Sequence, residues 1–300
     1  MDKYNTIIIG SGVAGMTAAL YLKRAGINTL VIEKESPGGQ ITKTSKIDNY
    51  PGYISIEGVD LALNIFNQLT NIGVPYSFSK VVKIEKQENG YLVTTTDNSY
   101  LTDNIIIAAG RTPRKLQVPN EKELSGKGIS WCAVCDGPLY KNKDVCVIGG
   151  GAAALEETIY LSKICSNVTL IHRRDKFRAN KETLNEVKSL PNVNILTNTT
   201  IKSFISTNNK LSAVIINNNG KEESLPIDGC FEFIGQVPNT SSFKDLNILD
   251  DEGYVEVDNN YQTNLKNIYA CGDCVKKDLY QIIVASSEGA IVANKIIKKA

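Results

Sequence analysis

The sequence predicts an α/β protein with two Rossmann-like, three-layer dinucleotide-binding domains, the second inserted into the first. Three observations predict this class. A glycine-rich turn occurs twice, each turn lies between an apolar strand and a helix, and the two repeats have equal spacing. A strand–turn–helix–strand unit of this kind binds the phosphates of a dinucleotide. One glycine motif alone would be weak evidence, whereas two in matching frames are strong.

The first repeat lies at the start of the chain. Residues 5–10 place three isoleucines before a glycine, which predicts a buried strand that ends in a turn. The turn is the run G-S-G-V-A-G of residues 10–15, and a helix is predicted over residues 16–25. A second buried strand covers residues 29–33 and ends at Glu33.

The second repeat has the same layout near the middle of the chain. A strand is predicted over residues 144–148, the turn G-G-G-A-A-A over 149–154, a helix over 155–165, and a strand over 168–171, followed by His172. From the first glycine of the turn to the residue that ends the second strand is 23 positions in both repeats (33 − 10 and 172 − 149). The equal spacing indicates a repeated unit.

Each repeat is followed by alternating polar and apolar sequence that turn residues interrupt. Residues 81–95 break at Asn89-Gly90. Residues 201–225 break at Asn208-Asn209 and again at Asn219-Gly220. Such turns predict small antiparallel hairpins laid on each sheet.

Each half then returns to an apolar strand closed by glycine, but the strand that completes the first half comes much later. The order of these strands predicts that the second unit interrupts the first, with proline-containing linkers as hinges. The returning strands cover residues 105–110 and 231–235. The late strand covers residues 267–270 and precedes a C-terminal helix. The linkers lie near residues 111–118 and 236–243. The predicted domains are 1–112 with 243–300, and 113–242.

Composition excludes several classes of protein. The 300 residues are 42% hydrophobic and 22% charged with a net charge of +1, so nothing indicates binding to nucleic acid or to a membrane surface. No stretch is long and apolar enough to span a bilayer, and a cytoplasmic location is expected. One histidine argues against a histidine-based metal site, and no metal is predicted. Cys146, Cys165 and Cys230 lie in apolar runs typical of buried thiols.

The residue that ends the second strand of each repeat indicates which nucleotide binds. Glu33 can accept hydrogen bonds from two ribose hydroxyls and would repel a 2′-phosphate, so the first repeat is expected to bind FAD or NAD. The second repeat has Arg173, Arg174 and Arg178 beside His172, and these are half of the six arginines in the chain. Guanidinium groups pair with phosphate oxygens, which favours NADPH over NADH. The alternative is a solvated basic turn.

Between the two repeats lies the run C-A-V-C-D-G, with Cys132, Cys135 and Asp136. A C-x-x-C pair can close a reducible disulfide, and its thiolate is the nucleophile for exchange. Asp136 can carry a proton to or from the sulfur or flavin. Without the flanking nucleotide sites, zinc binding or simple packing would be serious rivals.

Several runs together make the chain resemble the low-molecular-weight, bacterial-type thioredoxin reductases, of the pyridine nucleotide-disulfide oxidoreductase class II, along nearly its whole length. Besides the two glycine turns and C-A-V-C-D-G, they are P-G-G-Q (37–40), N-Y-P-G (49–52), H-R-R-D-K-F-R-A (172–179), I-G-Q-V-P-N-T (234–240) and G-D (272–273). The resemblance implies a homodimeric flavoprotein. Electrons would pass from NADPH through FAD to the Cys132–Cys135 disulfide, and Cys132 would then attack thioredoxin or a thioredoxin-like protein while the inserted domain rotates.

The resemblance also implies a set of binding residues. FAD would be held by Gly10, Ser11, Gly12, Ala14, Gly15, Glu33, Gly39, Gln40, Asn49, Val82, Ala109, Gly110, Gly272, Asp273, Gln281 and Ile282. NADPH would be held by Gly149, Gly151, Ala154, Glu157, His172, Arg173, Arg174 and Arg178.

The chain departs from the family pattern near the flavin and near the dithiol. Tyr280 precedes Gln281 where the family has arginine, and Pro138-Leu139 replaces aromatic residues after the dithiol. These departures keep two alternatives open: a reductase that takes electrons from ferredoxin, and a non-catalytic flavin-bound redox sensor. A second C-x-x-C at Cys271 and Cys274 could be a redox relay or part of a zinc site, although packed, reduced thiols are favoured. Trp131 could shield the dithiol, touch the partner, or simply pack.

Overall fold

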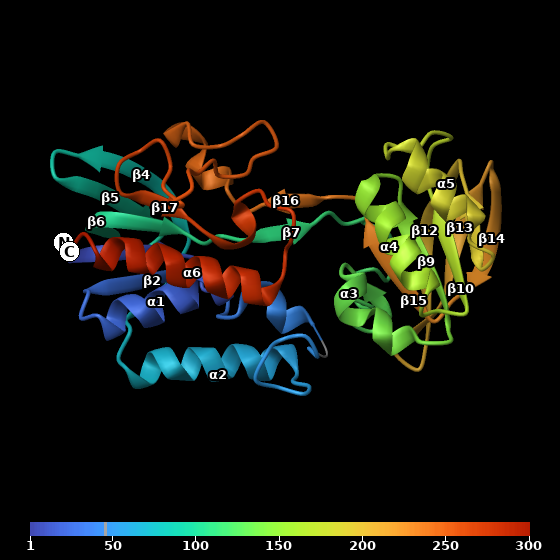
Figure 1. Cartoon of the computed structure of the whole chain (residues 1–300), viewed down its shortest axis with the longest axis horizontal. Helices are drawn as coiled ribbons and strands as arrows, with labels where there is room; N and C mark the ends of the chain where they lie inside the picture. The colour runs from blue at the N-terminus through green and yellow to red at the C-terminus, as the bar shows by residue number, and fades with distance from the viewer. Residues whose placement is uncertain (45–46) are drawn as a thin grey trace. The chain divides into compact units, whose positions relative to one another are not determined.

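The chain forms two compact units in the structure, a computed structural model that describes residues 1–44 and 47–300 (Figure 1). The first unit contains Met1–Thr112 and Val237–Ala300, and the second contains Pro113–Gln236. Both are α/β with parallel sheets, so the predicted fold class is confirmed. The chain returns to the first unit at Val237 and not at residue 243, because the Asn239 backbone N–H already donates to the Gly110 carbonyl at 3.0 Å.

A mostly parallel sheet forms the centre of the first unit. Its strands run in the order β3-β2-β1-β6-β5-β4, and β17 pairs with the second half of β6. The hairpin of β4 and β5 joins the first half of β6 in antiparallel pairing. The strands are β1 (Lys3–Ile9), β2 (Thr29–Glu33), β3 (Tyr76–Phe78), β4 (Val81–Gln87), β5 (Gly90–Thr95), β6 (Ser99–Ile107) and β17 (Ile268–Ala270). Two linker strands, β7 (Arg111–Pro113) and β16 (Gln236–Pro238), pair with each other.

Alternate residues of β1 face two different layers, as the period of a strand requires. Ile8 packs with α1 (Val13–Arg24) and α6 (Ile282–Ile297), and α2 (Gly58–Asn71) packs on the outside of α1 (Figure 1). Ile7 and Ile9 pack with the β4–β5 hairpin on the other face. The described part of this unit also contains the short 3₁₀ turns η1 (Gly39–Lys43), η3 (Ser241–Leu246) and η4 (Gly272–Cys274).

The second unit has a fully parallel sheet in the order β11-β10-β9-β15-β8. Its helices α4 and α5 cover one face, and a separate antiparallel sheet, β12-β13-β14, covers the other. The elements are β8 (Ile129–Ser130), α3 (Ala133–Asp136), η2 (Gly137–Tyr140), β9 (Asp144–Gly149), α4 (Ala152–Ser162), β10 (Asn167–Ile171), α5 (Lys181–Ser189), β11 (Val193–Leu196), β12 (Thr199–Thr207), β13 (Lys210–Asn218), β14 (Lys221–Pro226) and β15 (Gly229–Phe233).

The predicted hairpin turns occur where asparagine and glycine allow a left-handed backbone. Asn208 and Asn209 have φ of 53° and 60°, and Asn219-Gly220 closes the next hairpin. The hairpin of the first unit differs by one position, since its turn residues are Glu88 and Asn89. Gly90 is the first residue of β5 with φ of 103°, because it supplies the left-handed residue that follows this turn.

Candidate functional site

The first glycine turn joins β1 to α1, and its glycines have different tasks. A β-carbon on Gly10 would lie 2.3 Å from the Ala108 carbonyl oxygen, and one on Gly15 would lie 2.0 Å from the Gly10 carbonyl oxygen. These two glycines let strand, turn and helix pack closely. A β-carbon on Gly12 would meet nothing within 4 Å. The turn is therefore open at Gly12, where the N-terminus of α1 can receive a phosphate.

Glu33 ends β2 and is buried beside this turn. Its Oε2 accepts the Ser11 backbone N–H at 2.6 Å, and its Oε1 accepts the Glu35 backbone N–H at 2.9 Å. Glu33, Gly10 and Ala109 line a cavity of about 290 Å³. The Ser79 hydroxyl also belongs to this cavity and is buried without a hydrogen-bond partner. A ligand that carries hydroxyl groups and phosphates fits these polar groups.

The Gly272-Asp273 segment follows β17 and is held by a buried ion pair that the sequence did not reveal. The Glu288 carboxylate accepts the Gly272 backbone N–H at 2.7 Å and contacts the Lys277 ammonium. Lys277 also donates to the Gly272 carbonyl at 2.8 Å. A buried charge is stable only when it is paired in this way. The pair holds Gly272 in its left-handed conformation, with φ of 73°.

Tyr280, which departs from the family pattern, contacts an arginine from β7. The Arg111 guanidinium lies 3.3 Å from the centre of the Tyr280 ring, and its Nε lies 3.7 Å from Asp273 Oδ2. Burial raises the pKa of Asp273, while Arg111 and Lys277 oppose this increase. A guanidinium is therefore present at this segment although residue 280 is not an arginine.

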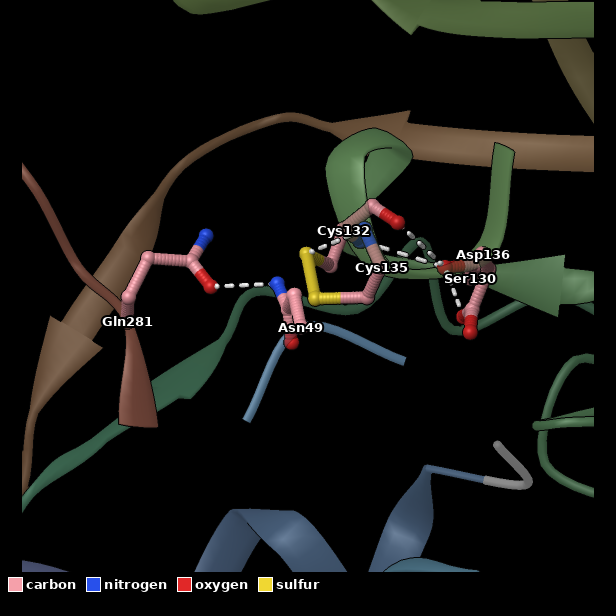
Figure 2. The surroundings of a disulfide bond; sticks show 6 residues. All are labelled: Asn49, Ser130, Cys132, Cys135, Asp136 and Gln281. Carbon is pink, nitrogen blue, oxygen red and sulfur yellow. Dashed lines mark hydrogen bonds between the residues drawn. A yellow bond between two sulfur atoms is a disulfide. The ribbon is translucent and has the colours of Figure 1, made fainter. Parts of the chain in front are cut away.

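Other predicted FAD residues lie on neighbouring segments of the first unit. The Asn49 amide donates to Gln281 Oε1 at 3.1 Å, which joins two residues far apart in sequence (Figure 2). Ile282 begins α6 and packs against the small apolar cluster that includes Val13. The Val82 side chain is 46% exposed, and its neighbour Val81 lines the cavity instead. The remaining predicted FAD residues are Ser11 and Ala14, both buried, Gly39 and Gln40 in η1, and Gly110 with φ of 64°.

The glycines of the second turn have the same two roles as those of the first: one packs closely and one leaves the turn open. A β-carbon on Gly149 would lie 2.5 Å from the Phe233 carbonyl oxygen, whereas one on Gly151 would meet nothing within 4 Å. Ala154 is buried in α4. Glu157, one turn further, is partly buried, and this burial raises its pKa.

The segment after β10 places one predicted residue in the interior and the others in solvent. His172 is 7% exposed, and a β-carbon on Gly150 would fall within 2.1 Å of its ring. Burial and the nearby arginines lower the pKa of His172, so its ring is neutral at neutral pH. Arg173, Arg174 and Arg178 are exposed, and the Arg178 backbone N–H donates to the Gly150 carbonyl at 2.7 Å. His172 thus packs against the turn, and the arginines remain available to a phosphate.

Cys132 and Cys135 form a disulfide with a Cα–Cα distance of 5.3 Å, Cys132 being the N-cap residue of α3. The Cys135 backbone N–H points to Cys132 Sγ at 3.2 Å. Ser130, which the sequence analysis missed, accepts the Cys132 backbone N–H at 3.1 Å and donates to Asp136 Oδ2 at 2.6 Å (Figure 2). No motif marks Ser130, because its role arises from the end of β8 lying beside α3.

Asp136 is a suitable proton carrier. Its Oδ1 is buried without a hydrogen-bond partner, and burial raises the pKa of the carboxyl while the Ser130 hydrogen bond opposes the increase. Burial also raises the pKa of the nearby Tyr140 to about 12. A carboxyl with a raised pKa holds a proton to higher pH and can deliver it to a leaving thiolate.

The second C-x-x-C pair is fully buried in the first unit. The Cys274 thiol contacts the carbonyl oxygens of Ile107 and Cys271 at 3.4 and 3.3 Å. Burial raises the pKa of Cys274 to about 11 and the pKa of Cys271 well above its usual value. Both are free thiols. Because they are buried and their pKa values are raised, they are far less reactive than an exposed pair.

Residues 4–289 match the family described as pyridine nucleotide-disulphide oxidoreductase. The chain is 39% identical to the thioredoxin reductases of Listeria monocytogenes and of Bacillus subtilis, over 98% of this chain and 93% of each relative. The crystal structure of thioredoxin reductase from Streptococcus pyogenes matches with a TM-score of 0.95 at 39% identity, over 99% of this chain and 97% of that one.

These matches define the class of protein: the chain belongs to the pyridine nucleotide-disulphide oxidoreductase family. Within that family, its relatives and structural neighbours are thioredoxin reductases of the bacterial type, and the family predicted from the sequence is confirmed. Within the described residues, no helix is long and apolar enough to cross a membrane.

Proposed function

We propose that the chain is a thioredoxin-disulfide reductase that takes electrons from NADPH and passes them, through FAD and the Cys132–Cys135 pair, to thioredoxin or a thioredoxin-like protein. The observation that carries the proposal is the disulfide beside Asp136, in a chain with two dinucleotide-type glycine turns. Relatives of nearly the same length that are named thioredoxin reductase support it. We also propose a homodimer, which light scattering would test.

FAD fits the first unit. Gly12 would face its pyrophosphate, Glu33 would accept from its ribose, and Asp273 and Gln281 would position the rest of the molecule. When bound, FAD would supply the chemistry that joins two-electron transfer from a nicotinamide to reduction of a disulfide. The unpartnered Ser79 hydroxyl in the cavity supports the fit, because a buried polar group requires a partner.

NADPH fits the turn of the second unit. Gly151 leaves space for its pyrophosphate at the N-terminus of α4. The exposed Arg173, Arg174 and Arg178 would bind its 2′-phosphate. His172 would fix the turn by packing on Gly150 and would not contribute a charge.

The dithiol would perform the exchange with the partner. Once reduced, Cys132 as thiolate attacks one sulfur of the partner's disulfide, forms a mixed disulfide and releases the partner's other thiolate. Cys135 then attacks Cys132 Sγ, which restores the Cys132–Cys135 disulfide and releases the second partner thiol. Asp136 supplies a proton to a leaving thiolate, and Ser130 keeps its carboxyl in place.

The test is an anaerobic titration of the purified flavoprotein with NADPH, followed by oxidised thioredoxin. We expect NADPH to bleach the flavin band rapidly, NADH to do so far more slowly, and thioredoxin to restore the colour. Asp136→Asn should lower kcat about 10²-fold with bleaching intact. Bleaching by reduced ferredoxin and by neither nucleotide would favour the ferredoxin-linked alternative. Bleaching without any disulfide turnover would favour a redox sensor.

A further inference from the structure

Two buried carboxyl groups lie side by side in the second unit, outside the machinery described above. Glu232 is the next-to-last residue of β15 and is 1% exposed, and Glu121, in the loop after β7, is 3% exposed. The two carboxyl groups are close enough for Glu121 to raise the pKa of Glu232. Two adjacent carboxylates in the interior repel each other, so the pair is stable only if one carboxyl keeps its proton.

The hydrogen-bond partners of the two carboxyl groups differ. The Glu121 carboxylate accepts the backbone N–H groups of residues 116, 117 and 118, at 3.0, 2.6 and 3.4 Å. Glu232 Oε2 accepts the Trp131 indole N–H at 2.9 Å, whereas its Oε1 is buried and receives no hydrogen bond. A proton on Glu232 Oε1 would turn this unpartnered atom into a donor, whereas Glu121 already receives three backbone N–H groups. Burial and the Glu121 charge raise the pKa of Glu232 to about 8.

The pair holds the residue that directly precedes the dithiol. Glu232 fixes the edge of the Trp131 indole, and the Lys115 ammonium lies 3.9 Å from the centre of its ring. Trp131 is only partly buried, so part of its ring remains available to another molecule. On the other side of C-A-V-C-D-G, Pro138 and Leu139 provide no aromatic ring. Exposed aromatic rings in rigid positions are effective contacts for protein partners.

We propose that Glu232, buried beside Glu121, is a positioning residue that holds Trp131 next to Cys132 as a contact surface for the disulfide-bearing partner. The proposal rests on the proposed function, since it assigns the recognition of the protein that Cys132 attacks. Ionisation of Glu232 would place its carboxylate against that of Glu121. This repulsion acts on Glu232 more strongly than the indole N–H, which favours the charged form, and it would displace the side chain that holds the ring.

The other groups that face the pair leave Glu232 as the titrating group. Lys115 attracts the Glu232 carboxylate, but this effect is the smallest of those acting on it. Cys230, on the same strand, contacts Cys146 on β9, and burial raises the pKa of the Cys230 thiol well above its usual value. A transition near pH 8 is therefore assigned to the Glu121–Glu232 pair.

The first experiment follows Trp131 fluorescence in the holoenzyme from about pH 6 to about pH 9. Trp131 is the only tryptophan, so the signal has one source. We expect a one-proton change near pH 8 in the unmodified protein. Glu232→Gln keeps an oxygen for the indole and an N–H for Glu121 but cannot ionise, so its signal should stay at the low-pH value. Glu222→Gln, an exposed control on β14, should behave like the unmodified protein. A transition that persists in Glu232→Gln would overturn the proposal.

The second experiment measures KM and kcat for thioredoxin at about pH 7 and about pH 9, beside reduction of a small synthetic disulfide. We expect KM for thioredoxin to rise about tenfold at high pH in the unmodified protein and to stay constant in Glu232→Gln. Trp131→Phe, which keeps a ring but loses the N–H, should raise KM at both pH values with kcat little changed. Turnover of the small disulfide should not follow these changes.

An equal pH dependence of KM in Glu232→Gln would refute the positioning role, whereas failure of NADPH to reduce the flavin would refute the proposed function alone.

Discussion

The two glycine turns share one backbone frame but present opposite chemistry to a nucleotide. In the first, Glu33 is buried and turned inward, where it accepts two backbone N–H groups. In the second, His172 is buried against Gly150, and three arginines point to solvent. We expect this frame to place a pyrophosphate at a helix N-terminus in both units. We then expect the residues after the second strand to determine which nucleotide binds.

The buried acids of the two units also differ, because their hydrogen-bond and charge partners are different. Glu288 in the first unit has an ammonium partner, Lys277, and a backbone N–H. Glu232 in the second unit has an indole N–H and another carboxyl. A neighbouring acid raises the pKa of a buried carboxyl, as Glu121 does for Glu232. The second unit is therefore the one whose stability should depend on alkaline pH.

The largest expected effect separates glycines that pack from glycines that face the ligand. Gly10→Ala and Gly149→Ala force a methyl group against a carbonyl oxygen, so each should cost about 4 kcal/mol or more of unfolding free energy. Gly12→Ala and Gly151→Ala meet no neighbour and should cost less than about 1 kcal/mol, while weakening nucleotide binding. Urea unfolding followed by circular dichroism measures the difference. Equal losses at all four positions would remove the distinction.

The next effect is on stability as a function of pH. Because the pKa of Glu232 is raised to about 8, the folded state holds this proton more tightly than the unfolded state. The resulting stabilisation is complete below the ordinary value of 4.5 and is lost as pH rises through about 8. Between about pH 5 and about pH 9 the second unit should lose on the order of 3 kcal/mol. Urea midpoints from Trp131 fluorescence test this, and Glu232→Gln should show almost no loss.

A smaller effect concerns the choice of nicotinamide. The double variant Arg173→Gln/Arg174→Gln removes two exposed guanidinium groups, and kcat/KM for NADPH should fall about 10²-fold while the value for NADH stays within about twofold. Lys176→Gln, an exposed cation on the same segment, is the matched control and should change little. Parallel losses with both nucleotides would mean that the arginines do not contact a 2′-phosphate.

The smallest effect is at the first turn. Glu33→Gln replaces a charged acceptor with a neutral one, so the dissociation constant for FAD should rise about tenfold. Glu35→Gln, whose side chain is 70% exposed, is the control. Equilibrium dialysis against FAD measures both. Unchanged FAD affinity in Glu33→Gln would show that the carboxylate serves only the Ser11 and Glu35 backbone groups.

Sequence reasoning found the elements that local patterns decide, but it misplaced several of their boundaries. The helices α1 and α4 begin three residues earlier than predicted, at Val13 and Ala152, because each helix starts inside its glycine turn. The boundary at residue 243 was six residues late, since pairing of β16 with β7 begins the return at Val237. The turn at Asn89-Gly90 was displaced by one position. Binding roles of individual residues stay predictions.

The sequence by itself determined the fold class, the repeated unit, the dithiol and the family, because each depends on residues that are close together in the chain. Glycine spacing, buried strands and C-x-x-C are local signals. Only the tertiary structure brought Ser130 to Asp136, Lys277 to Glu288, Arg111 to Tyr280, and Glu121 to Glu232. These pairs join side chains with no fixed sequence spacing, and their energies depend on burial. Packing therefore decided which buried acid meets a cation, which meets another acid, and which aromatic ring is held beside the dithiol.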